Sequence, residues 1–206
     1  MANGSSPLEI VLGLAVFALL LGPAVYRGLR KAKQQQQEWA AFASRRDWSF
    51  TATGPASSRF VVQGLHHGYP VSVRTEDRGG SVSELDESYD VTVLRVDLRG
   101  LIPPNLSLTH EARDEKGGGK ALPPAFLLEG ATPDMRELLD APRVRRLLEE
   151  LHQAYERFSI EERTLEVVHR GKPETRAELE AVLAPVLALV EALDPVGARP
   201  AGERHG

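Results

Sequence analysis

Hydrophobic positions divide the chain into three parts with different periodicities. From Ile10 to Tyr26 no residue carries a charge, and an apolar run of this length, about 26 Å as an α-helix, predicts one membrane-spanning helix. From residue 47 to about residue 130, short apolar runs alternate with turn residues, which predicts strands. Beyond residue 130 apolar residues recur every three or four positions, which predicts amphipathic helices.

The predicted strands belong to one sheet. A short turn at 66–68 joins the apolar runs 60–65 and 69–76, and this spacing predicts a β-hairpin. The apolar residues of 89–98 change phase midway, which predicts either a β-bulge or a strand covered on both faces. The same criteria predict further strands at 48–53, 106–109 and 125–129. They also predict a second β-hairpin, in which a turn at 161–163 joins the runs 158–160 and 164–169.

Local signals mark the predicted helices of the second half. Thr132 and Pro133 form an N-cap followed by a proline at the first helical position, and Pro142 starts a second helix. A last helix is expected to open at 171–173 and to kink at Pro185. The predicted class is α+β, with an N-terminal transmembrane helix followed by a mainly antiparallel sheet with two principal packed helices.

This reading divides the chain into five segments. Two polar, glycine-containing stretches, 77–88 and 111–124, are expected to be mobile loops, and they are candidates for contacts because loops often carry function. The segments are a short extracytoplasmic N-terminus at 1–9, a transmembrane helix at 10–26, a basic collar and juxtamembrane helix at 27–46, an α+β domain at 47–194 and a disordered tail at 195–206.

Charge on either side of the apolar run predicts its orientation. A basic collar of Arg27, Arg30, Lys31 and Lys33 follows the run, whereas only the acid Glu9 precedes it. The positive-inside rule then places the N-terminus outside and the C-terminal domain in the cytoplasm, with the collar at the lipid headgroups of the inner (plasma) membrane. A cleaved signal peptide would need basic residues before the run, and a buried helix of a soluble protein would usually carry a polar face.

Composition excludes several classes of partner and chemistry. The net charge of the chain is −4, and residues 1–33 hold four bases and one acid, so residues 34–206 carry about −7. An acidic domain repels phosphate backbones, and nucleic acid is therefore not an expected partner. The chain has no cysteine, which removes disulfides, thiolate metal sites, cysteine catalysis and lipoprotein anchors.

No motif predicts a catalytic, cofactor or metal site. If His66 and His67 lie on a strand, their side chains point to opposite faces and cannot bind one ion, and if they lie in the turn at 66–68 they are expected to be solvated polar residues. The stretch 117–120 has the glycines and lysine of a phosphate loop, but Ala121 stands where a serine or threonine is required. Glu149, His152 and Glu156 share a predicted helix face, and 149–152 is half of a carboxylate-bridged di-metal motif of which the sequence has no second copy. His169 lies near a predicted strand end without an acidic or histidine partner at useful spacing.

The layout resembles a group of uncharacterised bacterial single-pass membrane proteins that contain a domain of unknown function. The likeness covers most of the chain, and it implies a membrane location and this fold without implying an activity. It rests on the segments FASRRDWSFTATG, GLHHGYPVSV, AFLLEG, RELLDAPRVRRLLEEL and FSIEERTLEVVHRG.

Two functions remain open on the sequence. The first is a non-catalytic interaction or scaffold module at the cytoplasmic membrane face, with the lipid bilayer and another membrane or cytosolic protein as partners and with no cofactor. The alternative is a small-ligand sensor or enzyme with a pocket between sheet and helices. The collar and the helix after it could in addition sense lipid charge.

Overall fold

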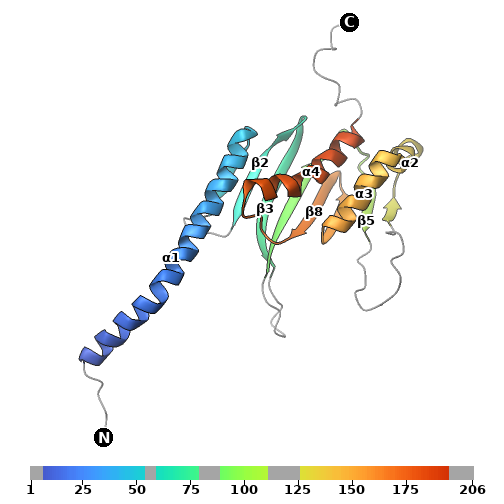
Figure 1. Ribbon diagram of the computed structural model, residues 1–206. Helices are drawn as coiled ribbons and strands as arrows, with labels where there is room; N and C mark the ends of the chain where they lie inside the picture. Colours follow the sequence, from blue (N-terminus) through green and yellow to red (C-terminus); the bar gives the residue numbers. More distant parts are fainter. Residues whose placement is uncertain (1–6, 54–58, 79–88, 111–125, 195–206) are drawn as a thin grey trace, which may run out of the picture.

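An eight-stranded sheet with helices packed on one face forms the body of the protein (Figure 1). The computed structural model describes residues 7–53, 59–78, 89–110 and 126–194, with the backbone alone at 7–25 and at residue 110. Every pair of neighbouring strands is antiparallel. The predicted α+β class is confirmed, with four helices in the described residues rather than two principal ones.

The strands follow a non-sequential order across the sheet. This order is β1-β2-β3-β4-β8-β7-β5-β6, so the β7–β8 hairpin lies between β4 and β5. The bounds are β1 Ser49–Ala52, β2 Phe60–His66, β3 Tyr69–Arg78, β4 Tyr89–Asp97, β5 Ser107–His110, β6 Phe126–Glu129, β7 Arg157–Glu161 and β8 Thr164–Arg170.

Helix α1, Pro7–Arg45, is continuous, although the sequence suggested separate membrane and juxtamembrane helices. Its last turns enter the core, where Trp39 and Phe42 are at most 1% exposed. Within the described part of the chain, none of the helices is both long and apolar enough to span a bilayer. The side chains of 10–25 lie outside that part, so the transmembrane segment stays a prediction.

Two hairpins, β2–β3 and β7–β8, have two-residue turns. In each turn both central residues have positive φ. The values are 52° at His67 and 89° at Gly68 in the first turn, and 50° at Glu162 and 63° at Arg163 in the second. This is the type I′ conformation, whose twist matches that of the flanking strands. The predicted hairpins β2–β3 and β7–β8 are therefore confirmed. The predicted loops at 79–88 and 111–124 and the tail at 195–206 lie outside the described residues.

The phase change within β4 reflects burial on both faces. Its register with β3 and with β8 is uniform, which rules out a bulge. Val91 and Val93 form a small cluster with Val168 on one face, whereas Leu94 and Val96 face the main core. Of the two alternatives that the sequence left open, the strand covered on both faces is the correct one.

The second half contains three described helices, two before the β7–β8 hairpin and one after it. Helix α2, Pro133–Asp140, has the predicted N-cap, because the Thr132 hydroxyl accepts a hydrogen bond from the Met135 amide at 3.3 Å. Helix α3, Pro142–Ala154, buries the predicted apolar stripe of Val144, Leu147, Leu148 and Leu151.

Helix α4, Arg176–Leu193, starts later than predicted. The Thr175 hydroxyl caps it by accepting from the Glu178 amide at 3.2 Å. Residues 171–173 stay outside the helix, and the Pro173 carbonyl accepts from Trp39 Nε1 at 2.9 Å instead. The helix continues through Pro185.

Gly64 provides a test of this packing, because its missing side chain leaves room for an indole ring. A Cβ at Gly64 would lie 2.0 Å from the Trp48 ring, which is 7% exposed and donates to the Leu65 carbonyl. We expect Gly64→Ala to lower the free energy of unfolding by about 1–3 kcal/mol, as overpacking does. Chemical denaturation of the full chain measures this.

The matched control is Gly28→Ala on the exposed side of α1. A Cβ there meets no atom within 4 Å, and alanine favours a helix over glycine. This control should therefore be neutral or stabilising. Equal stability of both variants would contradict the close approach of Trp48 to β2.

Candidate functional site

The predicted lipid-headgroup collar lies on the part of α1 that precedes the domain. The side chains of Arg27, Arg30, Lys31 and Lys33 are all exposed. One of them turns to the domain, because Lys31 Nζ lies 2.6 Å from Glu174 Oε1. Both partners are more than half exposed, so this ion pair contributes little to stability. The other three collar residues, Arg27, Arg30 and Lys33, are exposed to solvent, and the structure describes no ion pair for them.

A groove of about 830 Å³ runs along the same stretch of α1. Two apolar side chains in it are unusually exposed, Tyr26 at 67% and Leu29 at 54%. The basic side chains of Arg30 and Lys33 follow them at helical spacing in the lining of the same groove. An aromatic ring beside cationic side chains is typical of a helix at the membrane–water boundary.

Polar contacts fix the end of α1 to the start of α4. Gln35 Nε2 and Trp39 Nε1 both donate to the Pro173 carbonyl, at 2.8 and 2.9 Å. Glu38 accepts a hydrogen bond from the Arg176 amide at 3.1 Å. The Trp39 ring also packs 5.4 Å from the Phe60 ring, measured between centroids. These contacts join α1 to α4 and to β2 at one place.

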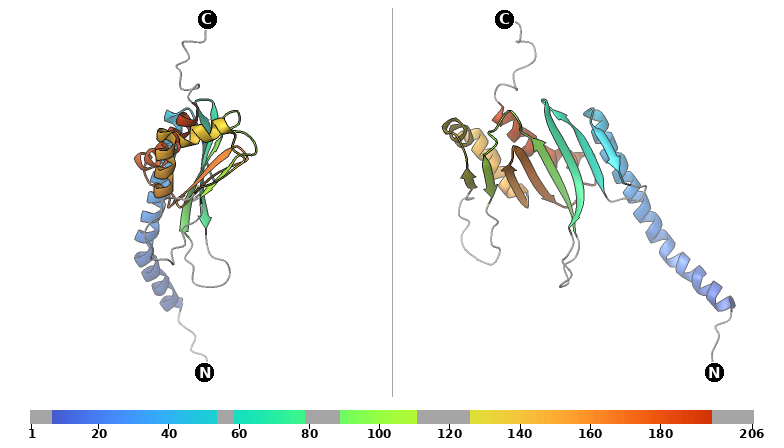
Figure 2. Two further views of the ribbon diagram at one scale, coloured as in Figure 1. Left: turned by 90° about the vertical axis from the view of Figure 1, so that its right-hand side faces the viewer. Right: turned by 180° about the vertical axis from the view of Figure 1, so that it is seen from behind.

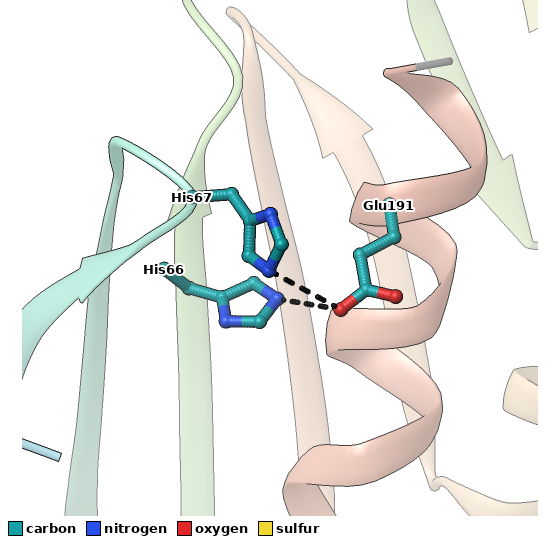
Figure 3. Close-up of side chains that lie close together, drawn as sticks. All are labelled: His66, His67 and Glu191. Atoms are coloured by element: carbon teal, nitrogen blue, oxygen red, sulfur yellow. Dashed lines mark hydrogen bonds and ion pairs between the residues drawn. The ribbon is translucent and has the colours of Figure 1, made fainter. Parts of the chain in front are cut away.

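A second group of polar side chains lies at the tip of the β2–β3 hairpin. His66 and His67 both turn toward Glu191 near the end of α4 (Figure 3). Their Nε2 atoms lie 3.1 and 3.7 Å from Glu191 Oε1, and their ring centroids are 4.4 Å apart. One potential ligand atom from each residue lies within 4.8 Å of the others.

This arrangement differs from that of two histidines on one strand, whose side chains would point to opposite faces. His66 is the last residue of β2, but His67 occupies the first position of the turn with φ at 52°. The left-handed backbone rotates the second ring back to the side of the first. Histidine is among the residues that accept this conformation more often than most. The turn at His67-Gly68 was visible in the sequence, but its effect on side-chain direction was missed.

A neighbouring contact secures the same hairpin tip. The Tyr69 hydroxyl donates to Asp194 Oδ2 at 2.7 Å, and burial together with this hydrogen bond raises the pKa of Tyr69 to about 12. Burial and the neighbouring His67 lower the pKa of His66, although Glu191 opposes the shift. The hydroxyl therefore stays protonated at neutral pH, and the His66 imidazole is mainly neutral.

The other residues considered from the sequence do not come together. Glu149 and Glu156 are exposed and His152 is half-buried, and the His66–His67–Glu191 group is the one cluster of potential metal ligands in the described part of the chain. The glycine-rich stretch at 117–120 lies outside the described residues. His169 is half-buried on β8, with its ring 6.0 Å from that of Tyr155.

Comparison with known proteins leaves the family open. No protein-family model matches the chain, and no curated protein sequence matches it. A crystal structure of the mycobacterial trehalose monomycolate transport factor A, TtfA, is similar at 13% sequence identity and a TM-score of 0.49. The similarity covers 77% of this chain and 94% of that one. Similarity at this level carries no information on function, and the resemblance described above stays an expectation.

The buried position of His169 predicts a dependence of stability on pH. Burial lowers its pKa below 6.5, so the unfolded chain takes up a proton at a higher pH than the folded chain does. Stability is therefore complete above pH 6.5 and falls as the pH drops toward the lower folded pKa. We expect His169→Gln to lose less stability than the parent between pH 7.5 and pH 5.5, as measured by urea unfolding. An unchanged pH dependence would contradict the lowered pKa.

Proposed function

We propose that the protein is a single-pass inner-membrane protein whose α+β domain acts as a non-catalytic interaction module at the cytoplasmic face. The continuity of α1 carries this proposal, because one helix extends from the apolar stretch at 10–26 into the domain core. A helix that is apolar at one end and packed in a core at the other would be a stalk of fixed orientation. A flexible linker would leave the domain free to rotate.

Helix geometry gives the height of the domain above the bilayer. From Tyr26 to Trp39 the helix rises about 20 Å, at 1.5 Å per residue. The headgroup layer beyond the hydrocarbon is roughly 5–7 Å thick on each side. The core contact at Trp39 would then stand clear of the lipid, whereas Arg27, Arg30 and Lys33, together with the Lys31–Glu174 ion pair, would lie at or just above the headgroups.

The sheet face away from the helices supports an interaction role. Figure 2 shows that the helices gather on one side of the sheet. Charged side chains of the other face are paired along and across strands, as in Arg74–Glu76 on β3 and Arg95–Glu166 between β4 and β8. A face on which positive and negative charges are paired suits a protein partner better than a nucleic acid, whose phosphates require an excess of positive charge.

Apolar side chains add to this face. On β2 and β6 the strand alternation places Leu65 and Leu127 opposite the core, and they are 64% and 59% exposed. A hollow of about 420 Å³ lies between them on β4, β7 and β8, with Arg95, Arg157 and Glu161 in its lining. A partner that covers this face would bury both leucines together with the paired charges between them.

The alternative, a small-ligand sensor or enzyme, would need a pocket between sheet and helices. Fully buried side chains fill that region, among them Leu94 and Leu165 from the sheet and Leu151 and Leu183 from the helices. Both grooves described above lie elsewhere, along α1 and on the opposite sheet face. The interaction module is therefore the function that the geometry favours.

Site-directed labelling tests the membrane location and the orientation. The chain has no cysteine, so Glu149→Cys on the exposed side of α3 gives one reactive site. We expect a membrane-impermeant maleimide to label it only after cell lysis. Replacing Arg27, Arg30 and Lys33 by glutamine should produce a labelled fraction in cells with only the outer membrane permeabilised, because these charges set the orientation.

The matched control removes three charges from the domain instead. Arg143, Arg145 and Arg146 are exposed on α3, and their replacement by glutamine should leave the labelling as in the parent. Full labelling of the parent without lysis would overturn the orientation, and recovery of the parent in the soluble fraction would overturn the membrane location.

Photo-crosslinking in the producing cells tests the interaction role. A photoreactive residue at Gln63, exposed on the open sheet face, should give a discrete protein adduct with the full chain. The same residue at Glu150, exposed on α3, is the control and should give none. Equal products from both positions, or none from either, would argue against the open face as a protein-binding surface.

A further inference from the structure

The hairpin tip and the end of α4 bring three potential metal ligands to one point. His66 and His67 approach the same oxygen of Glu191, at 3.1 and 3.7 Å (Figure 3). In a tetrahedral zinc site with bonds of about 2.0–2.1 Å, neighbouring ligand atoms lie ~3.3 Å apart. The two observed distances fall on either side of this value, so small side-chain rotations would complete the ligand geometry.

The chemistry of the three groups selects the class of ion. Two imidazole nitrogens and one carboxylate oxygen suit zinc and similar first-row cations, whereas calcium and magnesium prefer oxygen ligands alone. Neutral imidazole is the form that binds metal. Glu191 supplies the negative charge, and Arg46 is the nearby cation that acts against a bound ion.

The site is held in place by features other than contacts among its ligand side chains. The Tyr69–Asp194 hydrogen bond links the hairpin to the last turn of α4, and the type I′ turn fixes His67. The side chains of His67 and Glu191 are 46% and 36% exposed. An ion could therefore enter from solvent without rearrangement of the backbone, and one coordination position would face the solvent.

We propose that His66, His67 and Glu191 bind a divalent cation of the zinc class, which clamps the β2–β3 hairpin tip to the C-terminal end of α4. In Figure 1 this end of the domain lies far from the N-terminal end of α1. The open coordination position would thus face the solvent side, where water or a side chain of a partner completes the shell. The site is independent of the proposed membrane location.

Isothermal titration of the full chain with zinc chloride tests the site. The protein is made without a polyhistidine tag, purified in detergent and stripped with a chelator. We expect one zinc ion per chain, and a melting temperature that rises with zinc concentration because the ion binds the folded state. Zinc that does not bind would overturn the proposal and leave the three residues as an ordinary histidine–glutamate contact.

The variant His67→Asn separates metal binding from folding. Asparagine followed by glycine is the preferred pair for a type I′ turn, so this variant keeps the hairpin and should match or exceed the parent in stability without zinc. Its zinc affinity should fall by about tenfold or more, because one of three ligands is lost. Zinc affinity equal to that of the parent would overturn the assignment.

Two substitutions on α4 provide the matched comparison. Glu191→Gln removes the carboxylate ligand and should weaken zinc binding by at least about tenfold. Glu180→Gln removes an exposed carboxylate of the same helix, whose observed partner is Arg176 at 3.6 Å, and should bind zinc like the parent. Equal loss in both variants would indicate a nonspecific charge effect and would overturn the site.

Discussion

The packing of Trp39 on the connection before α4 is the interaction on which the rest of the structure depends. Its ring is fully buried against Phe60, and its Nε1 donates to the Pro173 carbonyl at 2.9 Å. Truncation of a buried tryptophan costs about 3–5 kcal/mol. This contact joins the sheet, α4 and the long N-terminal helix, so the apolar segment and the domain turn together.

A rigid stalk changes what the domain can present. The helices lie on one side of the sheet, and on the opposite face Val91, Val93 and Val168 are buried, whereas its paired charges and two leucines are exposed and available to a partner. Fixed attachment through α1 would present that face in one direction relative to the bilayer. This arrangement would favour an interaction module, because the orientational freedom of the domain is already restricted before the partner binds. Less of that freedom is then lost on binding.

The hairpin tip shows how a turn places chemistry. A left-handed residue at position 67 brings two adjacent imidazoles to the same side, which an extended strand cannot do. The end of α4 then supplies Glu191 and Asp194 to the same hairpin. The contacts of His66, His67 and Tyr69 with Glu191 and Asp194 thus fall within the last turn of α4 and its cap.

The sequence by itself determined the features that depend on neighbours along the chain. It predicted the two hairpins from their turns and the start of α2 from Thr132 and Pro133, because turn and cap preferences act over a few residues. Only the tertiary structure decided the start of α4, the insertion of β7–β8 beside β4, and the meeting of His66 with Glu191. Those two residues are 125 positions apart, and no local preference brings them together, because that contact follows from how the whole sheet and its helices pack.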